Sequence, residues 1–518
     1  MASSKPRSTP AWATLAVCCV AQFMVILDVT IVNVALPRMR DDLGLSTGGL
    51  QWVVNAYTLT FAGFLLLGGR AADLWGRRRV FLAGLGLFTV CSLAGGLAQG
   101  GAWLITARAV QGVGGAVLAP ATLSLLTSRF TAPNERRRAL GAWSITSASG
   151  AAVGVLAGGV LTDLLDWRWV LFVNVPIGAA VAVLAILALA ESRPDGPRAR
   201  LDTLGALTVT LGLAALVYGI VGTTSHPWGS ARTLVTLGAG AVLLALFTII
   251  ETRFAKNPLV PFSVFKRRSL TLVNAVTISI GAANFGVYYF LSLYLQQVEG
   301  YSPLRAGLDF LPVGLSAFAG ALAGIRLVVR LGVRNQLVLG PAVAAAGLIW
   351  LAATLSPGQS YPAHLLVPLI MFGGGMGLSF TPMAMGATQG VPPDQAGLAS
   401  GLINATRQVG GAIGLAVMAT AASGLTSRHL ASDGTARALT DGYALAFLIA
   451  GLGLVAGMLL ALALPPATAG PESAVRGEEH DGGHGYERRR DGSRVGSRSG
   501  DRGAAGRPRQ ERRPSRSR

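Results

Sequence analysis

Asp28 is the single acidic residue in an apolar stretch of about 25 residues that begins at Ala11 and closes with LDVTIVNVALP at Pro37. An ionised carboxylate near the middle of a membrane span costs about 2.5–3.5 kcal/mol on insertion scales, so it normally faces a bundle interior or a watery cavity. Acids in such positions mark paths for ions or protons. We therefore expect Asp28 to lie on the proton or ion path of a membrane protein.

Arg108 is the basic residue best placed to pair with Asp28. It lies about six residues into a later apolar stretch, where an arginine is as costly as an acid and needs a partner or water. A cation beside Asp28 favours the ionised carboxylate, whereas desolvation favours the protonated one, and a proton carrier needs both tendencies. The alternative is that Arg108 extends to the outer interface of the bilayer, which Trp103 marks.

Asp309 is a second candidate for a group that binds and releases protons. Ser302 and Pro303 predict a helix start, because serine caps helices and proline suits the first turn. Asp309 then lies about 9 Å into the following span, at 1.5 Å per residue. Arg305 lies four residues earlier on the same helical face, so an interfacial ion pair explains Asp309 equally simply.

The elements that position these charges must cross a membrane. Of the 518 residues, 52% are hydrophobic and only 13% charged, a composition too apolar for a soluble chain of this length. About fourteen apolar stretches approach the ~20 residues that cross a bilayer as a helix. Within about 3 residues they run over 12-34, 49-69, 79-99, 102-128, 138-163, 168-190, 203-223, 232-251, 271-296, 304-326, 336-355, 362-387, 400-422 and 442-464. This pattern predicts an all-α integral membrane protein; a count of twelve would place the seventh and eighth stretches outside the bilayer.

Lysine and arginine in the loops predict the orientation. Alternate loops carry about 21 basic residues on one side and about 7 on the other, and the richer side is normally cytoplasmic. We therefore expect both termini in the cytoplasm, an even number of spans, and insertion in the plasma (inner) membrane. The first apolar stretch is too long for a signal peptide and lacks a small-residue cleavage site ahead of Asp28, so it should be retained.

The net charge of +19 does not indicate nucleic-acid binding, because the inner loops and the arginine-rich segment 466-518 account for it. This segment has almost no Leu, Ile, Val or Phe, so we expect a disordered cytoplasmic tail. The tail either binds anionic membrane lipids or is merely solvated. The three cysteines lie in apolar spans, which indicates neither disulfides nor a metal site.

Internal repetition predicts two related halves. The segment 112-115 leads to Pro120, and 374-377 leads to Pro382 at the same spacing about 260 residues later. GAAVG at 150-154 is matched at nearly the same offset by GGAIG at 410-414. Two six-helix halves with two helices inserted between them account for both offsets, although glycine-rich helices can also match by chance. The predicted parts are the cytoplasmic N-terminus 1-10, the halves 11-190 and 271-465, the insert 191-270 and the tail 466-518.

Three motifs carry a resemblance to a known family. The loop at 69-79 reads GRAADLWGRRR, span four contains RAVQG at 108-112, and span five repeats glycine every four residues. These resemble the G-x-x-x-D-x-x-G-R-R, R-x-x-x-G and G-x-x-x-G-P-x-x-G-G motifs of the major facilitator superfamily. Over about residues 11 to 465 the chain resembles its fourteen-span drug:proton antiporter family, the EmrB/QacA-like group.

The resemblance implies roles for the motif residues. In the loop, Gly76 permits a tight turn and Asp73 can pair with arginines of neighbouring helices, so the segment resembles a latch between conformations. This latch comprises Gly69, Asp73, Gly76, Arg77 and Arg78. The corresponding loop of the second half has Val329 in place of the acid, so the latch should depend on Asp73.

The glycines of span five should form one smooth packing ridge, because steps of four residues drift only about 40° around a helix. The ridge comprises Gly150, Gly154, Gly158 and Gly159. Val155 replaces the motif proline, which removes the expected kink and weakens the inference to antiport. Close helix packing without a role in transport explains the ridge equally well.

The function implied is export of amphiphilic or lipophilic drugs by alternating access, driven by the proton-motive force through Asp28 and Arg108. Candidates for the substrate cavity, each of which could instead pack in the core, are Gln51, Trp52, Asn55, Tyr57 and Asn284. An uptake symporter of a polar solute would share the fold, and a sensor or scaffold acting through the tail is a further alternative. No motif of a hydrolase, metalloenzyme or nucleotide-binding enzyme is present, so we expect a transporter without a cofactor or metal. We also expect the transporter to be a monomer.

Overall fold

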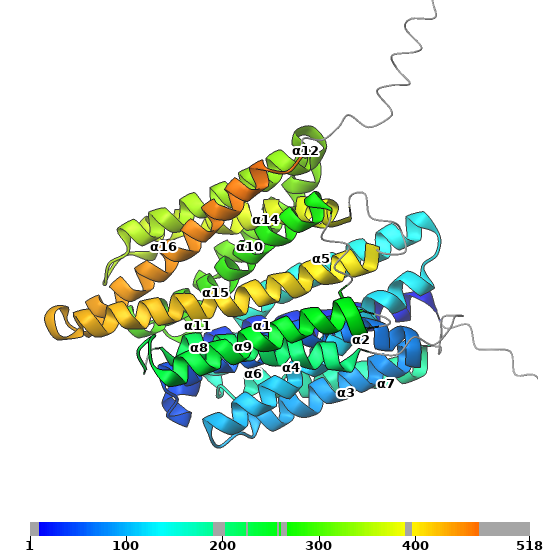
Figure 1. The fold of residues 1–518 in the computed structure, drawn as a ribbon, viewed down its shortest axis with the longest axis horizontal. Coiled ribbons are helices and arrows are strands. Elements are labelled where there is room, and N and C mark those ends of the chain that lie inside the picture. Colours follow the sequence, from blue (N-terminus) through cyan, green and yellow to red (C-terminus); the bar gives the residue numbers. More distant parts are fainter. Residues whose placement is uncertain are drawn as a thin grey trace, which may run out of the picture. The chain divides into compact units, whose positions relative to one another are not determined.

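A computed structural model describes residues 10–189, 202–223, 226–255, 258–260, 267–388 and 396–465, and these residues form helices and connecting turns without a strand (Figure 1). The predicted tail and parts of the predicted linkers lie outside the described residues. The first half consists of α1 (Ala11–Leu43), α2 (Thr47–Trp75), α3 (Arg77–Gly96), α4 (Gly101–Arg129), α5 (Pro133–Leu164), α6 (Trp169–Phe172) and α7 (Asn174–Ala188).

The helices of the segments predicted as the insert and the second half follow next. The insert comprises α8 (Thr203–Gly222), α9 (Ala231–Ile249) and the π-helix η1 (Ile250–Phe254). The second half comprises α10 (Arg268–Leu293), η3 (Tyr294–Val298), α11 (Pro303–Asp309), α12 (Leu311–Thr354), α13 (Tyr361–His364), α14 (Leu366–Thr388), α15 (Ala396–Asp433) and α16 (Thr435–Leu462). The predicted cap is confirmed, because the Ser302 hydroxyl accepts a hydrogen bond from the Arg305 amide at 3.3 Å.

Twelve helices among the described residues are long and apolar enough to span a membrane. One of these runs from Pro303 to Thr354 and is divided at Gly332, where φ is 75°. It covers two of the predicted stretches, 304-326 and 336-355. The 32-residue helix α5 is not among the twelve, although its segment Val153–Leu164 is apolar. The count of fourteen therefore stays a prediction.

Equivalent glycines make equivalent contacts in the two halves. A Cβ atom at Gly150 would lie 3.1 Å from the Phe23 carbonyl of α1, and one at the equivalent Gly410 would meet the Ile278 carbonyl of α10. The helix α5 thus packs on α1 as α15 packs on α10. Gly76 and Gly332, with φ of 99° and 75°, form the corresponding turns of the two halves. The repeat seen in the sequence is therefore a repeat of helix packing.

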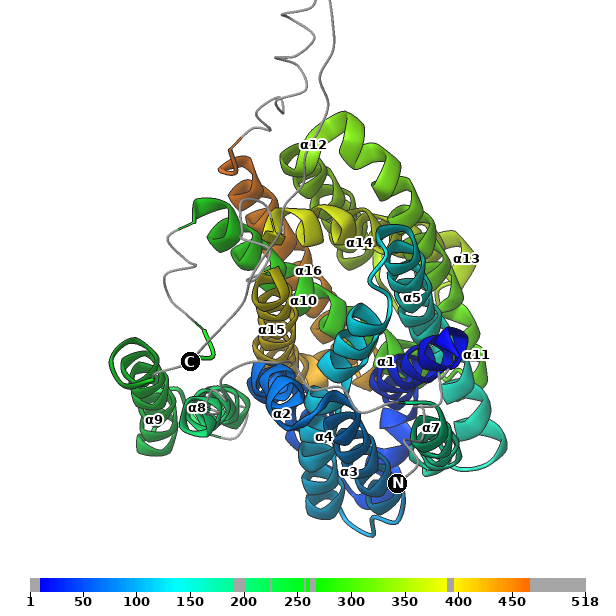
Figure 2. The ribbon, with the colours of Figure 1, turned by 90° about the vertical axis from the view of Figure 1, so that its right-hand side faces the viewer.

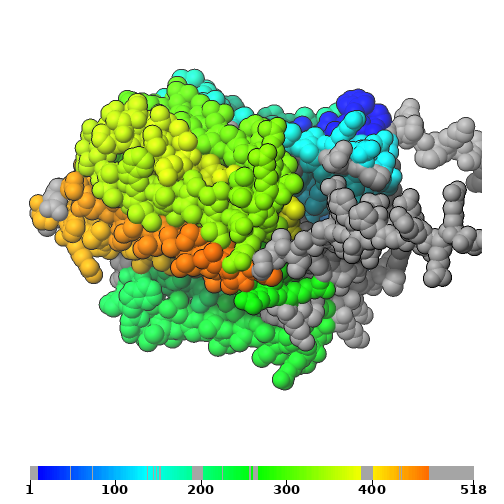
Figure 3. Space-filling model, turned by 90° about the horizontal axis from the view of Figure 1, so that it is seen from above, coloured from blue at the N-terminus to red at the C-terminus, as the bar shows by residue number. Residues whose placement is uncertain are grey.

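The insert packs beside both halves. Figure 2 shows α8 and α9 as a pair next to α2 and α15, and Figure 3 shows them as a green band below the orange C-terminal helices. Where the insert ends, the buried Glu251 carboxylate accepts hydrogen bonds from the Leu259 and Val260 amides, both at 3.1 Å. The Arg70 side chain of α2 donates to the Pro258 carbonyl at 2.6 Å. The exit of the insert is therefore tied to α2.

The two halves meet at the end of the bundle where Gly44 joins α1 to α2, which we call the Gly44 end. Pro37 lies inside α1 and has no N–H, so the Asn33 carbonyl lacks its usual donor four residues ahead. The Ser292 hydroxyl of α10 donates to this carbonyl at 2.8 Å, and the Gln296 amide donates to the Val34 carbonyl at 2.9 Å. We call these two hydrogen bonds the α1–α10 clasp.

Candidate functional site

Asp28 and Arg108 form a buried ion pair between α1 and α4. The Arg108 Nη1 donates to Asp28 Oδ2 at 2.6 Å, and the two side chains are 2% and 0% exposed. The structure therefore brings together the two residues that were expected to pair, and Arg108 does not extend to the bilayer interface. The contact forms because Asp28 lies on a buried face of α1 and Arg108 lies on a buried face of α4.

Neutral side chains complete the shell around the carboxylate. The Gln111 and Asn174 side-chain amides each donate to Asp28 Oδ1 at 2.9 Å. The Asn174 amide also donates to the Ser92 hydroxyl at 3.0 Å, and that hydroxyl donates to the Leu171 carbonyl at 2.8 Å. Both carboxylate oxygens thus have charged or amide donors, which is what makes a buried ion tolerable.

Arg108 has contacts that do not depend on Asp28. Its Nη1 also donates to Gln111 Oε1 at 2.8 Å, and its Nε donates to the Val53 carbonyl at 3.4 Å. The guanidinium lies 4.3 Å from the centre of the Tyr57 ring, an arrangement that stabilises a cation electrostatically. The cation therefore keeps acceptors and an aromatic face when the carboxylate is neutral.

The sequence did not reveal the roles of Gln111, Asn174 and Ser92. Gln111 follows Arg108 by three residues, so it lies on the same helical face and could have been found by that spacing. Asn174 was visible as an amide within an apolar stretch, but its distance of 146 residues from Asp28 in the chain conceals the contact. Ser92 carries no local signal that separates it from other small residues of α3.

The proposed cavity residues do not gather in one place. Tyr57 lies in the Asp28 network, whereas Trp52 lines a separate cavity beside the insert. Gln51 and Asn55 are fully buried on α2, and their amide atoms have no hydrogen-bond partner among the described residues. Asn284 is half-buried on α10.

Asp309 lies at the junction of α11 and α12. The Tyr361 hydroxyl donates a hydrogen bond to the backbone carbonyl of Asp309. The Arg305 guanidinium lies 3.6 Å from the centre of the Tyr301 ring, and it forms no ion pair with Asp309. The interfacial ion pair is therefore not formed, and the Asp309 role in proton coupling stays a prediction.

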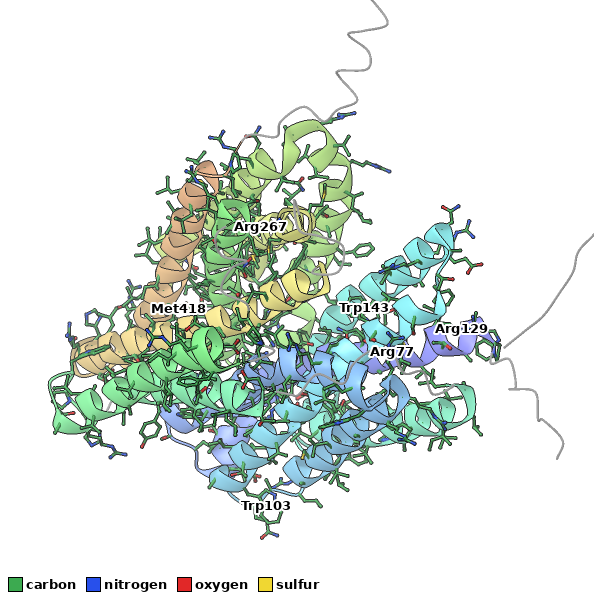
Figure 4. All side chains as sticks on the ribbon, turned by 45° about the vertical axis from the view of Figure 1, so that its right-hand side comes forward. Arg77, Trp103, Arg129, Trp143, Arg267 and Met418 are labelled. Atoms are coloured by element: carbon green, nitrogen blue, oxygen red, sulfur yellow. The ribbon has the colours of Figure 1, made fainter. Side chains whose placement is uncertain are left out.

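The loop that resembles a latch joins α2 to α3 at Gly76. The Arg78 side chain donates to the Ile186 carbonyl of α7 at 2.8 Å. Figure 4 shows Arg77 and Arg129 at the end of the first half that lies away from Trp103. The side chain of Asp73 lies outside the described part of the structure, so the latch contact stays a prediction.

The glycine ridge of α5 lies directly against its neighbours. Gly150 and Gly158 approach the Phe23 and Ile31 carbonyls of α1, and Cβ atoms there would lie 3.1 and 2.7 Å away. On the other side of α5, Gly159 approaches Pro303 of α11. Val155 is buried where α5 meets α11. The ridge therefore packs against α1 of the first half and α11 of the second half. This close packing is compatible with a role in transport and does not require one.

Comparisons with known proteins identify the family. A model described as Major Facilitator Superfamily matches residues 18–415. The chain is 44% identical over 424 residues to the cephamycin export protein CmcT of Amycolatopsis lactamdurans, covering 81% of this chain and 87% of that protein. It is 42% identical over 461 residues to the puromycin resistance protein pur8 of Streptomyces alboniger, covering 88% and 90%. The chain belongs to the major facilitator superfamily.

A solved structure shows the same fold. The crystal structure of a D-xylose-proton symporter matches with a TM-score of 0.63 at 14% identity, covering 88% of this chain and 98% of that chain. The expected all-helical fold of this superfamily is confirmed. The chain is therefore a multi-pass membrane transporter and not an enzyme.

Proposed function

We propose that this transporter exports amphiphilic organic compounds, antibiotics among them, in exchange for protons by alternating access. The buried Asp28–Arg108 pair carries the proposal, because it supplies a protonatable group in the interior of the first half. The similarity to a cephamycin export protein and a puromycin resistance protein supports an antibiotic as the substrate.

The geometry of the network suggests how one proton is exchanged. A proton that enters from the outer side binds to an Asp28 carboxylate oxygen and neutralises it. Arg108 then remains held by Gln111 Oε1, the Val53 carbonyl and the Tyr57 ring. After the halves reorient, the proton leaves to the cytoplasm, and Asp28 pairs with Arg108 again. Arg108 thus keeps hydrogen-bond acceptors and an aromatic contact while Asp28 is protonated.

The proposal includes the expected topology. The protein would cross the plasma membrane fourteen times as a monomer, with both termini in the cytoplasm and the latch residues on that side. In this topology the Gly44 end faces outward. Reorientation must then break the α1–α10 clasp, because α1 and α10 belong to different halves.

Weakening the clasp should favour the outward-open state. Ser292→Ala deletes the donor to the Asn33 carbonyl, and one lost hydrogen bond of about 0.5–1.5 kcal/mol shifts the equilibrium by about two- to tenfold. Spin labels at the exposed residues Asp41 and Ser360, placed in a cysteine-free background, would report a longer distance by pulsed electron resonance.

Ser279→Ala is the matched control for the clasp, because the hydrogen bond of this α10 hydroxyl to a described residue stays within its own helix, at the Val276 carbonyl. The control should retain the wild-type distance distribution. A distribution unchanged by Ser292→Ala would contradict the clasp.

Transport in inverted membrane vesicles tests the direction and the coupling. An exporter that exchanges substrate for protons should concentrate labelled puromycin inside vesicles whose lumen is acidified, and a protonophore should abolish this uptake. A proton-coupled uptake symporter would instead release puromycin from preloaded acidic vesicles. Deletion of residues 466-518 should leave puromycin uptake into the vesicles intact, because the helices alone carry out transport. A sensor or scaffold that acts through the tail would instead lose its activity.

A further inference from the structure

A cavity of about 430 Å³ lies at the Gly44 end, beside the insert. Its walls come from α2 of the first half, α15 of the second half, and both α8 and α9, which Figure 2 shows side by side. A volume of several hundred cubic ångströms is typical of sites for small organic molecules. The cavity is separate from the Asp28 network, which lies within the first half.

The cavity combines a cation with an aromatic wall. The Arg232 guanidinium donates to the Tyr218 hydroxyl at 2.6 Å and lies 3.4 Å from the His226 ring nitrogen. The Tyr218 ring contacts the Trp52 ring, with 6.2 Å between their centres. Hydroxyl groups of Ser46, Thr236 and Ser423 occur among the remaining lining residues.

Among the described residues, no carboxylate compensates the charge of this cavity. None of its lining residues is acidic, and Arg232 forms no ion pair with a described residue. Arg232 and Tyr218 are both exposed, so a ligand can reach them from the surface. A guanidinium with free N–H groups beside hydroxyls and an aromatic face suits a phosphate attached to an apolar body.

We propose that this cavity binds the phosphate group of an amphiphilic organic phosphate. Arg232 is the main contact for the anion, and Trp52 and Tyr218 contact the apolar part. The source is either a membrane phospholipid or a soluble organic phosphate, which share this chemistry. Because the walls come from both halves and the insert, a bound ligand would hold α2 and α15 at their present separation.

Gly222 offers a way to fill the cavity without disturbing the fold. It lines the cavity, and a Cβ atom added there would meet no atom within 4 Å. Gly222→Leu should therefore occupy the binding space. Gly238 on α9 is equally free of close neighbours but does not line the cavity, so Gly238→Leu is the matched control.

Binding to the purified full-length protein tests the proposal with two probes. Native mass spectrometry measures phosphatidylglycerol against diacylglycerol, and calorimetry in nanodiscs measures phenyl phosphate against phenol. We expect the dissociation constant of the phosphate probe to rise at least tenfold in Arg232→Gln and in Gly222→Leu. The first variant loses hydrogen bonds to the charged phosphate, and the second blocks the space in which they form. Arg232→Lys should retain part of the affinity, and Gly238→Leu all of it.

The probe that responds identifies the source of the ligand. An effect on phosphatidylglycerol alone assigns the cavity to a membrane lipid, and an effect on phenyl phosphate assigns it to a soluble ligand. The proposal is overturned if neither probe loses affinity in Arg232→Gln, or if Gly238→Leu weakens binding as much as Gly222→Leu does.

Discussion

Asp28→Asn is expected to reduce proton-driven export to the level of cells that lack the protein. Asparagine keeps the shape of the side chain but neither takes up a proton nor carries a negative charge, so the exchange cycle loses its proton site. The measurement is efflux of puromycin from energised cells with and without a protonophore. Asp41→Asn is the matched control, because Asp41 is an exposed acid at the end of the same helix. Proton-dependent export by Asp28→Asn would refute the role.

Loss of folding must be separated from loss of the proton site. Breaking a buried pair by removing one partner costs about 3–5 kcal/mol, because the other charge is left uncompensated. The contacts of Arg108 with Gln111, Val53 and Tyr57 should offset part of this cost. The double variant Asp28→Asn with Arg108→Gln removes the isolated cation as well. It should regain thermal stability relative to Asp28→Asn and still fail to export.

Gly158→Ala is expected to destabilise the protein by about 1–3 kcal/mol, although alanine is the better helix former. The added methyl group would lie 2.7 Å from the Ile31 carbonyl, so α5 and α1 would have to separate. The melting temperature of the purified protein measures this effect, and export by cells at equal protein level measures its consequence for transport.

Gly86→Ala on α3 is the control for this substitution. A Cβ atom at Gly86 meets nothing within 4 Å, so the gain in helix propensity should leave the melting temperature unchanged or raise it. A lower melting temperature for Gly158→Ala and an unchanged or higher one for Gly86→Ala would establish that the close approach of α5 to α1, and not helix flexibility, explains the glycine ridge. A Gly158→Ala protein as stable as the wild type would contradict this explanation.

The ion pair could be predicted because burial makes single charges conspicuous in an apolar sequence. Asp28 and Arg108 stood out individually, and the cost of burying either one alone implied the other. The glycines of span five likewise predicted a face for close helix packing, because a missing side chain lets another helix approach, but they did not identify α1 as the partner.

Other parts of the site depend on how distant helices meet. Asn174 comes to Asp28 only because α7 packs against α1, and no local pattern encodes that contact. Trp52 was expected in the substrate cavity, yet the position of the insert places it in a wall shared with Tyr218. The sequence predicted helices at 203-223 and 232-251, but not which other helices they contact.

The neutrality of the Asp28–Arg108 pair has an electrical consequence for the proposed exchange. The pair carries no net charge when both groups are ionised, and it carries one positive charge when Asp28 is protonated. Exchange of one proton for a neutral compound therefore moves one elementary charge, and each 100 mV of membrane voltage contributes about 2.3 kcal/mol. That energy corresponds to about a 50-fold concentration ratio. Exchange for a monovalent cation moves no net charge, so such compounds would be driven by the pH gradient alone.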